Sequence, residues 1–101
     1  MFDSILVANR GEIALRIMRT AQAMGIQTIA IYVDADKDSP HVRFADKAVL
    51  LPDGGYLDID AVLDAAQKSN AGAIHPGYGF LSENAEFAKR VKKENIVWVG
   101  P

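Results

Sequence analysis

The segment from His75 to Asn84 combines residue types that could form a binding loop. It follows a short apolar run and precedes an amphipathic helical pattern, so the sequence predicts a strand end, a loop and a helix start. Gly77 and Gly79 flank Tyr78 and lack a Cβ, which would let a ligand approach the backbone closely. Tyr78 and Phe80 offer apolar ring faces for such a ligand. The alternative is a tight strand-to-helix turn whose aromatic rings cover the core.

A second group of polar residues follows the first apolar run of the chain. Asn9 and Arg10 come directly after that run, and Glu12, Arg16 and Arg19 recur at steps of four and three, so the last three share one stripe of a helix. On an exposed helix face such ion pairs contribute little to stability. Asn9, Arg10 and Glu12 are harder to explain in this way, because a charge in a crevice needs a partner.

Complete catalytic motifs are missing from the sequence. His41 and His75 are far apart, and neither has a second histidine or a cysteine at metal-ligand spacing, so no metal site is predicted. His75 is interpreted as a structural histidine at a strand end rather than as an acid or base. The segment Asn9 to Ala14 has one glycine instead of Gly-x-Gly-x-x-Gly, and no phosphate-binding P-loop occurs. The chain therefore carries at most part of an active site.

The elements that position these residues alternate between strands and helices. Apolar runs predict strands over 5–8, 28–32, 48–51, 71–74 and 96–99. Helical spacing predicts helices over 12–24, 59–66 and 83–93, with at most one or two turns over 41–45. In the first helix the apolar positions are Ile13, Ile17, Ala21 and Met24. Gly25 should end that helix, and Asp58 and Ser82 should cap the two later ones.

This alternation predicts an α/β fold with a doubly wound, Rossmann-like parallel sheet of about five strands in the order 3-2-1-4-5. In such a sheet the chain changes direction between strands 1 and 4, and ligands bind between the loops that leave those strands. These loops are 9–12 and 75–80. The sequence therefore places Asn9, Arg10, Glu12, His75 and Gly77 around one crevice.

Composition and length limit the function further. The 101 residues form one domain, half of them hydrophobic, and a formal net charge of −2 argues against a nucleic-acid partner. Without cysteine the chain has no disulfide or thiolate nucleophile, which fits a reducing compartment. No membrane span or targeting segment is visible. We expect a cytoplasmic protein, or a mitochondrial matrix protein if a transit peptide has been removed.

Several long motifs together resemble the N-terminal domain of biotin carboxylases. They are Ala8 to Ala14, Asp34 to Asp36, His41 to Asp46, Tyr56 to Ile59 and His75 to Asn84. The resemblance covers essentially all of residues 1–101. One departure is the loop 52–55, which is shorter than the usual loop of the family. The family includes the carboxylases of acetyl-CoA, propionyl-CoA, methylcrotonyl-CoA, pyruvate and urea, and the departure leaves open which acceptor this chain serves.

The resemblance implies a pre-ATP-grasp domain of an ATP-dependent ligase. In that family ATP and bicarbonate form carboxyphosphate, and the carboxyl group passes to N1 of biotin on a carrier protein. ATP, magnesium and bicarbonate are held by later parts of the protein, so the present segment should be inactive alone. Tyr78 and Gly79 match positions that line the biotin pocket, and no residue of this segment matches a catalytic one.

The resemblance also implies partners. They are the rest of the same chain, a biotin carboxyl carrier domain or protein, and a carboxyltransferase. Arg16 and Arg19 would lie at the subunit interface of a homodimer. The alternative is an autonomous doubly wound module that binds a small ligand or a protein partner without catalysis.

Overall fold

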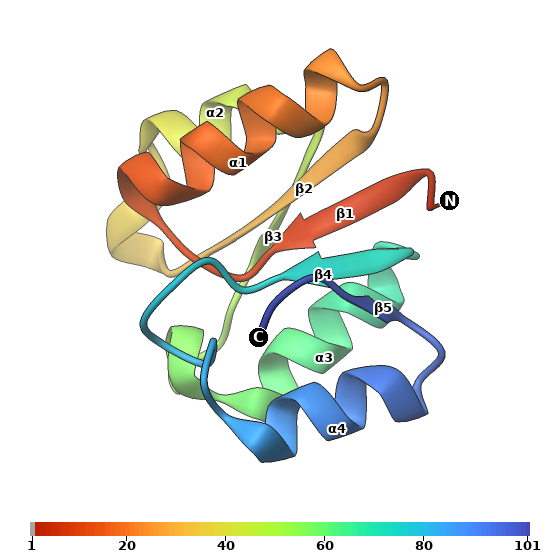
Figure 1. Cartoon of the computed structure of the whole chain (residues 1–101). Coiled ribbons are helices and arrows are strands. Elements are labelled where there is room, and N and C mark those ends of the chain that lie inside the picture. Colours follow the sequence, from red (N-terminus) through yellow and green to blue (C-terminus); the bar gives the residue numbers. More distant parts are fainter. Residues whose placement is uncertain (1) are drawn as a thin grey trace.

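The computed structural model describes residues 2–101 and shows a five-stranded parallel sheet with helices on both faces (Figure 1). The elements along the chain are β1 (Ser4–Val7), α1 (Gly11–Ala23), β2 (Gln27–Tyr32), the 3-10 turn η1 (Asp34–Asp36), α2 (Pro40–Phe44), β3 (Lys47–Leu50), the 3-10 turn η2 (Gly55–Leu57), α3 (Ile59–Lys68), β4 (Ala73–His75), α4 (Ala85–Lys93) and β5 (Val97–Trp98). The strand order β3-β2-β1-β4-β5 confirms the predicted topology. In Figure 1, α1 and α2 lie on one face of the sheet and α3 and α4 on the other.

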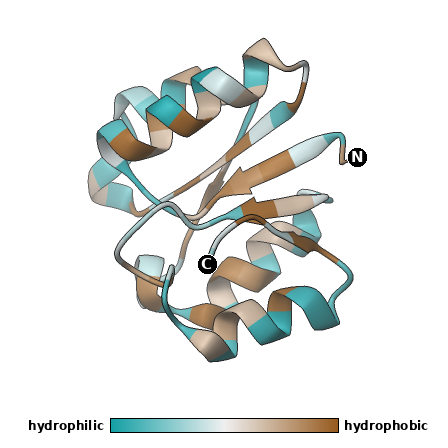
Figure 2. Ribbon diagram, viewed as in Figure 1, coloured by the Kyte–Doolittle hydropathy of each residue, from teal (hydrophilic) through white to brown (hydrophobic). Residues whose placement is uncertain are grey.

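The central strand β1 is buried along its whole length, as its continuous apolar run predicts. Successive side chains point to opposite faces of the sheet. Leu6 therefore joins the hydrophobic cluster under α3 and α4, whereas Val7 joins Ala14 and Met18 under α1. Figure 2 shows hydrophobic strands between helices whose outer surfaces carry hydrophilic residues. The two cores hold β1 and β4 side by side, which fixes the position of the loops that follow them.

The buried face of α1 differs from the predicted one. Its buried residues are Ala14, Leu15, Met18 and Ala21, so of the four predicted apolar positions only Ala21 is buried. Apolar residues occupy more than half of this helix, and the stripe with Ala14 and Met18 packs against Val7 and Ala30 of the sheet. The stripe that carries Ile13 and Ile17 lies at the side of this buried face and is partly exposed.

The helix ends confirm two of the three capping predictions. Gly25 follows α1 with φ of +78°, and the Asp58 side chain accepts a hydrogen bond from the Ala61 N–H. The prediction that Ser82 caps the next helix is wrong. Leu81 and Ser82 are buried in a further turn, and α4 begins two residues later with Asn84 as its cap, accepting from the Phe87 N–H. Ser82 instead donates its backbone N–H to the Gly79 carbonyl.

β3 and β5 form the two edges of the sheet. β5 is shorter than predicted, and β4 begins and ends later than predicted. Trp98 in β5 is half-buried and packs edge-on against Phe87 of α4, with ring centroids 5.5 Å apart. Within residues 2–101, the helices are too short and too polar to cross a membrane.

Candidate functional site

The carboxyl ends of β1 and β4 bring the two predicted loops together. Asn9, which follows β1, is 2% exposed, and its Nδ2 donates to the carbonyl oxygens of Pro76 and Tyr78 at 2.9 and 2.7 Å. Its Oδ1 accepts from the backbone N–H of Arg10 at 2.8 Å. Parallel neighbouring strands place their carboxyl ends at the same edge of the sheet, and the order reverses here. Asn9 therefore joins the two loops at the switch point.

The two glycines of the loop have different roles. Both have positive φ, +67° at Gly77 and +72° at Gly79, which L-residues with a side chain rarely adopt. A Cβ on Gly77 would lie 2.8 Å from Asn9 Nδ2, so the group that approaches this glycine closely is Asn9 rather than a ligand. A Cβ on Gly79 would have no atom of the described chain within 4 Å. The space beside Gly79 is open to an incoming molecule.

The aromatic residues of the loop point in different directions. Tyr78 is 70% exposed, whereas the Phe80 ring packs on Tyr56 with centroids 5.3 Å apart. His75 is half-buried, and its Nδ1 accepts from the Gly77 N–H at 3.1 Å. Burial lowers the pKa of His75 below its ordinary value, so the ring is neutral at pH 7 and can accept this hydrogen bond. The loop thus offers one free aromatic side chain next to an open glycine.

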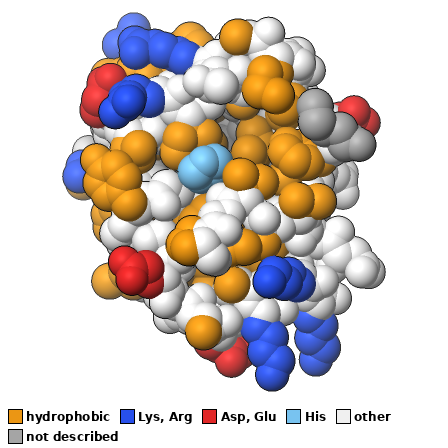
Figure 3. Space-filling view, in the orientation of Figure 1, with side chains coloured by type: hydrophobic (Ala, Val, Ile, Leu, Met, Phe, Trp, Pro, Cys, Tyr) orange, Lys and Arg blue, Asp and Glu red, His pale blue; other side chains and the backbone are white. Residues whose placement is uncertain are grey.

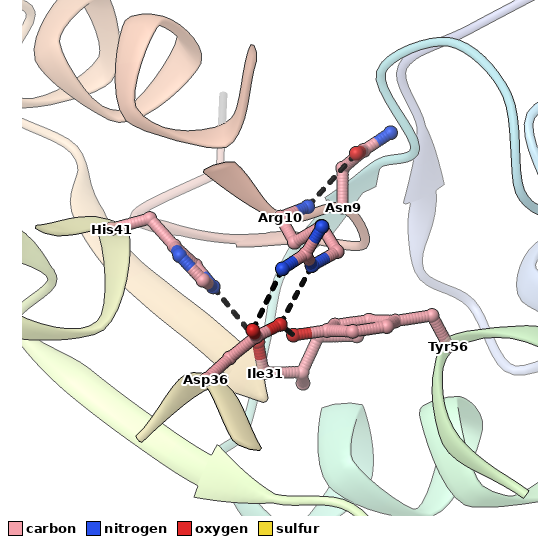
Figure 4. Close-up of polar contacts among 6 residues, drawn as sticks. All are labelled: Asn9, Arg10, Ile31, Asp36, His41 and Tyr56. Atoms are coloured by element: carbon pink, nitrogen blue, oxygen red, sulfur yellow. Dashed lines mark hydrogen bonds and ion pairs between the residues drawn. The ribbon is translucent and has the colours of Figure 1, made fainter. Parts of the chain in front are cut away.

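The partner of Arg10 is a carboxylate that sequence reasoning did not assign to the site. Arg10 Nε and Nη2 donate to the two oxygens of Asp36 at 2.7 Å each, and the Tyr56 hydroxyl donates to Asp36 Oδ2 at 2.7 Å (Figure 4). The Arg10 hydrogen bonds, joined by the Tyr56 hydroxyl and opposed by burial, lower the pKa of Asp36 from 3.8 to about 2. Burial and the bond to Asp36 raise the pKa of Tyr56 to about 12. Asp36 is therefore ionised at neutral pH and Tyr56 is a fixed donor.

The sequence indicates that Arg10 needs a carboxylate partner, but it does not identify which one. A crevice arginine requires an opposite charge, and the polar segment after β2 offers Asp34, Asp36 and Asp38 as candidates. Only the turn η1 selects Asp36, which is 5% exposed. The sequence predicts no role for His41, yet the structure buries it fully, with Nε2 3.3 Å from the Ile31 carbonyl (Figure 4). Its Nδ1 has no hydrogen-bond partner within residues 2–101, and burial lowers its pKa.

The remaining predicted residues lie along α1 beside a groove. Glu12 is exposed and lies 3.8 Å from Arg19 across the predicted stripe. Arg16 and Arg19 line a groove of about 820 Å³ between α1 and the β4–β5 side of the sheet. The rest of its lining is mostly apolar and includes Ile13, Ile17, Met24, Val99, His75 and Tyr78. Figure 3 shows hydrophobic side chains gathered around the visible histidine on this face.

Metal-ligating side chains are dispersed in the part of the chain that the structure describes. Residues 2–101 contain no group of three or more histidine, aspartate or glutamate side chains that could hold a metal ion. The groups that converge at the switch point are instead an amide, a guanidinium, a phenol and one carboxylate that is already neutralised by its partners. Such a set can position a ligand or a loop, and it offers no free base.

Comparison with known proteins matches the whole chain. The family described as "Biotin carboxylase, N-terminal domain" matches residues 1–101. Biotin carboxylase 2 of Bacillus subtilis is 52% identical over 105 residues, covering 100% of this chain and 24% of that protein. The human mitochondrial propionyl-CoA carboxylase alpha chain is 53% identical, covering 99% of this chain and 14% of that protein.

A solved structure gives the same result for the fold. The biotin carboxylase domain dimer of Hydrogenobacter thermophilus 2-oxoglutarate carboxylase, in complex with MgADP, ADP and bicarbonate, superposes with a TM-score of 0.95 at 44% identity. The match covers 100% of this chain and 23% of that one. The chain thus spans less than a quarter of the length of these three relatives. By sequence and fold, it belongs to the biotin carboxylase N-terminal domain family.

Proposed function

We propose that this chain is the N-terminal domain of a biotin-dependent carboxylase and forms one wall of the cleft in which carrier-bound biotin is carboxylated. The observation that carries the proposal is the loop after β4, which is fixed by Asn9 and presents Tyr78 and Gly79 outward. Both residues match the positions that line the biotin pocket in the family. In this proposal the reaction is inferred from the family, and the position of the biotin is inferred from the loop.

The geometry suits a compact, partly apolar ring system such as that of biotin. An exposed aromatic ring can pack on one side of the ligand, and a glycine with no neighbouring atoms lets the other part approach the backbone. Tyr78 and Gly79 are therefore substrate-positioning residues in this proposal, and none of the described residues is assigned to bond making.

ATP, Mg²⁺ and bicarbonate would be bound outside this segment. The related 2-oxoglutarate carboxylase domain, which is more than four times as long, was solved with MgADP and bicarbonate. In the same proposal ATP and bicarbonate give carboxyphosphate in those further parts, and this domain closes the cleft over the biotin. The 101-residue segment alone should then be inactive as a ligase.

The groove beside α1 supports an interface with further protein. Apolar side chains of two isoleucines are left partly exposed next to Arg16 and Arg19, which could pair with acidic groups. We assign this face to the rest of the same chain and to a second subunit, since the related carboxylase domain forms a dimer. A biotin carboxyl carrier and a carboxyltransferase complete the set of partners, in the cytoplasm or the mitochondrial matrix. The alternative of an autonomous module is not favoured, because the relatives are carboxylases.

The test compares two glycines in the full-length carboxylase that carries this domain. Gly79 and Gly25 both have φ above +70°, and an added Cβ meets no described atom within 4 Å at either position, but Gly25 lies at the far end of α1. Gly79→Ala and Gly25→Ala therefore have similar backbone penalties. We expect Gly79→Ala and Tyr78→Ala to lower the ratio of biotin-dependent to biotin-independent ATPase, with about fivefold for Tyr78→Ala from an aromatic contact of about 1 kcal/mol.

The matched control makes the result interpretable. Gly25→Ala should leave the ratio unchanged while lowering the melting temperature by as much as Gly79→Ala. If Tyr78→Ala and Gly79→Ala reduce both ATPase activities in equal proportion, the two residues belong to the scaffold and the proposed biotin wall is wrong.

A further inference from the structure

We propose that Asn9, Asp36 and Tyr56 are positioning residues that hold the Tyr78–Gly79 loop in its binding conformation by fixing it on both sides. The inference rests on the proposed function for its ligand, biotin. Its structural part is independent, because it concerns the order of the loop itself.

The first fixed point is the Asn9 side chain. Both Nδ2 hydrogens are used, one on the Pro76 carbonyl and one on the Tyr78 carbonyl, and Oδ1 accepts from the Arg10 N–H. The positive φ of Gly77 turns the backbone so that these two carbonyl oxygens converge on one amide. Reversing the amide would set its oxygen against two carbonyl oxygens, so one orientation is fixed. Asn9 therefore holds the loop by hydrogen bonds immediately before Gly79.

The second fixed point lies after Gly79. Phe80 has φ of +47°, which is strained for a bulky residue and persists only where the surroundings hold it. The Tyr56 ring packs on Phe80 with an interplanar angle of 47°, and the buried Leu81 follows. Tyr56 is itself fixed because its hydroxyl donates to Asp36.

The two fixed points are linked through one carboxylate. Asp36 accepts from Tyr56 on one side and from Arg10 on the other, and Arg10 is the chain neighbour of Asn9 (Figure 4). A contact path thus runs from the Pro76 and Tyr78 carbonyls through Asn9, Arg10, Asp36 and Tyr56 to Phe80. Between its ends the Tyr78 side chain is exposed, and the space beside the Gly79 Cα holds no atom of residues 2–101 within 4 Å of a built Cβ. This arrangement orders the backbone before biotin arrives, which removes an entropic penalty from binding.

The experiment uses the full-length carboxylase with two mild variants, Tyr56→Phe and Asp36→Asn. Tyr56→Phe keeps the ring on Phe80 and removes only the hydroxyl, and Asp36→Asn keeps the size and removes the charge. The matched control is Asp46→Asn, because Asp46 Oδ2 also accepts two hydrogen bonds, from the Thr28 N–H at 2.8 Å and its hydroxyl at 3.0 Å, at the opposite end of β2. Two quantities are measured: amide hydrogen exchange of a peptide spanning 76–82, and KM for free biotin against KM for ATP.

We expect Asp36→Asn to speed exchange in 76–82 and to raise KM for free biotin by roughly tenfold, the effect of ordering about one residue. KM for ATP and kcat at saturating biotin should stay within about twofold of wild type. Tyr56→Phe should show the same pattern more weakly, and Asp46→Asn should show neither change.

Unchanged exchange in both variants overturns the positioning role. So does a biotin KM that stays constant in Asp36→Asn while Tyr78→Ala raises it. If exchange rises but neither Asp36→Asn nor Tyr78→Ala alters biotin kinetics, the biotin wall is what fails, and the exchange data still support the fixed loop.

Discussion

The contrast between Gly77 and Gly79 gives a quantitative test of how the loop is held. Both glycines have nearly the same positive φ, so replacing either with alanine carries the penalty of a left-handed L-residue, about 1 kcal/mol. Only at Gly77 does the new Cβ meet another group, Asn9 Nδ2 at 2.8 Å. Asn9 must then leave its two carbonyl partners, each bond being worth about 1 kcal/mol. We expect a loss of unfolding free energy of about 3 kcal/mol for Gly77→Ala and about 1 for Gly79→Ala.

The assay is urea unfolding of the 101-residue chain, followed by circular dichroism and by Trp98 fluorescence. A double-mutant cycle isolates the clash: in an Asn9→Ala background, Gly77→Ala should cost no more than Gly79→Ala, which gives a coupling energy of about 2 kcal/mol. Gly79→Ala combined with Asn9→Ala should be additive. Equal losses for the two glycine variants, or a coupling energy near zero at Gly77, would refute the assignment of Asn9 as the group that Gly77 accommodates.

Four further predictions follow from the same structure. Because the folded pKa of Asp36 is about 2, below its ordinary 3.8, its contribution of about 1–2 kcal/mol should be complete above pH 4 and disappear as the pH falls through 2; urea unfolding of wild type and Asp36→Asn should converge over that window. Asn84→Ala should lower stability by about 1 kcal/mol as an N-cap, and Ser82→Ala by much less, as judged by thermal melting. The isolated 101-residue chain should unfold cooperatively and show no bicarbonate-stimulated ATPase, and measurable activity would contradict the assignment of ATP to other parts. Replacing both Arg16 and Arg19 with glutamate in the full-length protein should weaken self-association in sedimentation velocity, and an unchanged dimer would remove them from the interface.

The strand order could be predicted because it follows from rules that act on the whole chain. Strands alternating with helices leave few right-handed parallel topologies, and the resemblance pointed to the same fold. The meeting of the Asn9 and Pro76 loops followed from that order alone. The hydrogen bonds between the two loops confirm that they meet. The sequence pattern could not show that the side-chain amide of Asn9 donates to the carbonyl oxygens of both Pro76 and Tyr78.

The details that were missed depend on three-dimensional packing. Periodicity identified an apolar stripe on α1, but more than half of the residues of this helix are apolar. The stripe that packs on the sheet is the one that carries Ala14 and Met18, in contact with Val7 and Ala30. Ser82 has the right type for a cap, but its backbone N–H bonds to the Gly79 carbonyl in a further turn, and α4 begins at Ala85 with Asn84 as its cap. Asp36 could not be selected among neighbouring aspartates until η1 turned it inward.

The position of β1 in the middle of the sheet has a consequence for synthesis on the ribosome. β1 pairs with β2 soon after emerging, but its other neighbour is β4, and the Asn9 side chain bonds to Pro76, 67 residues later in the chain. During translation the apolar edge of β1 therefore stays unpaired while more than half of this segment is made, a state prone to association with other nascent chains. We expect a ribosome-associated chaperone to bind nascent chains that end before β4 and to release them once residues 73–76 have left the exit tunnel. The pairing of β4 with β1 ends this period, and the same step brings the Pro76 loop, which carries the proposed biotin wall, next to Asn9.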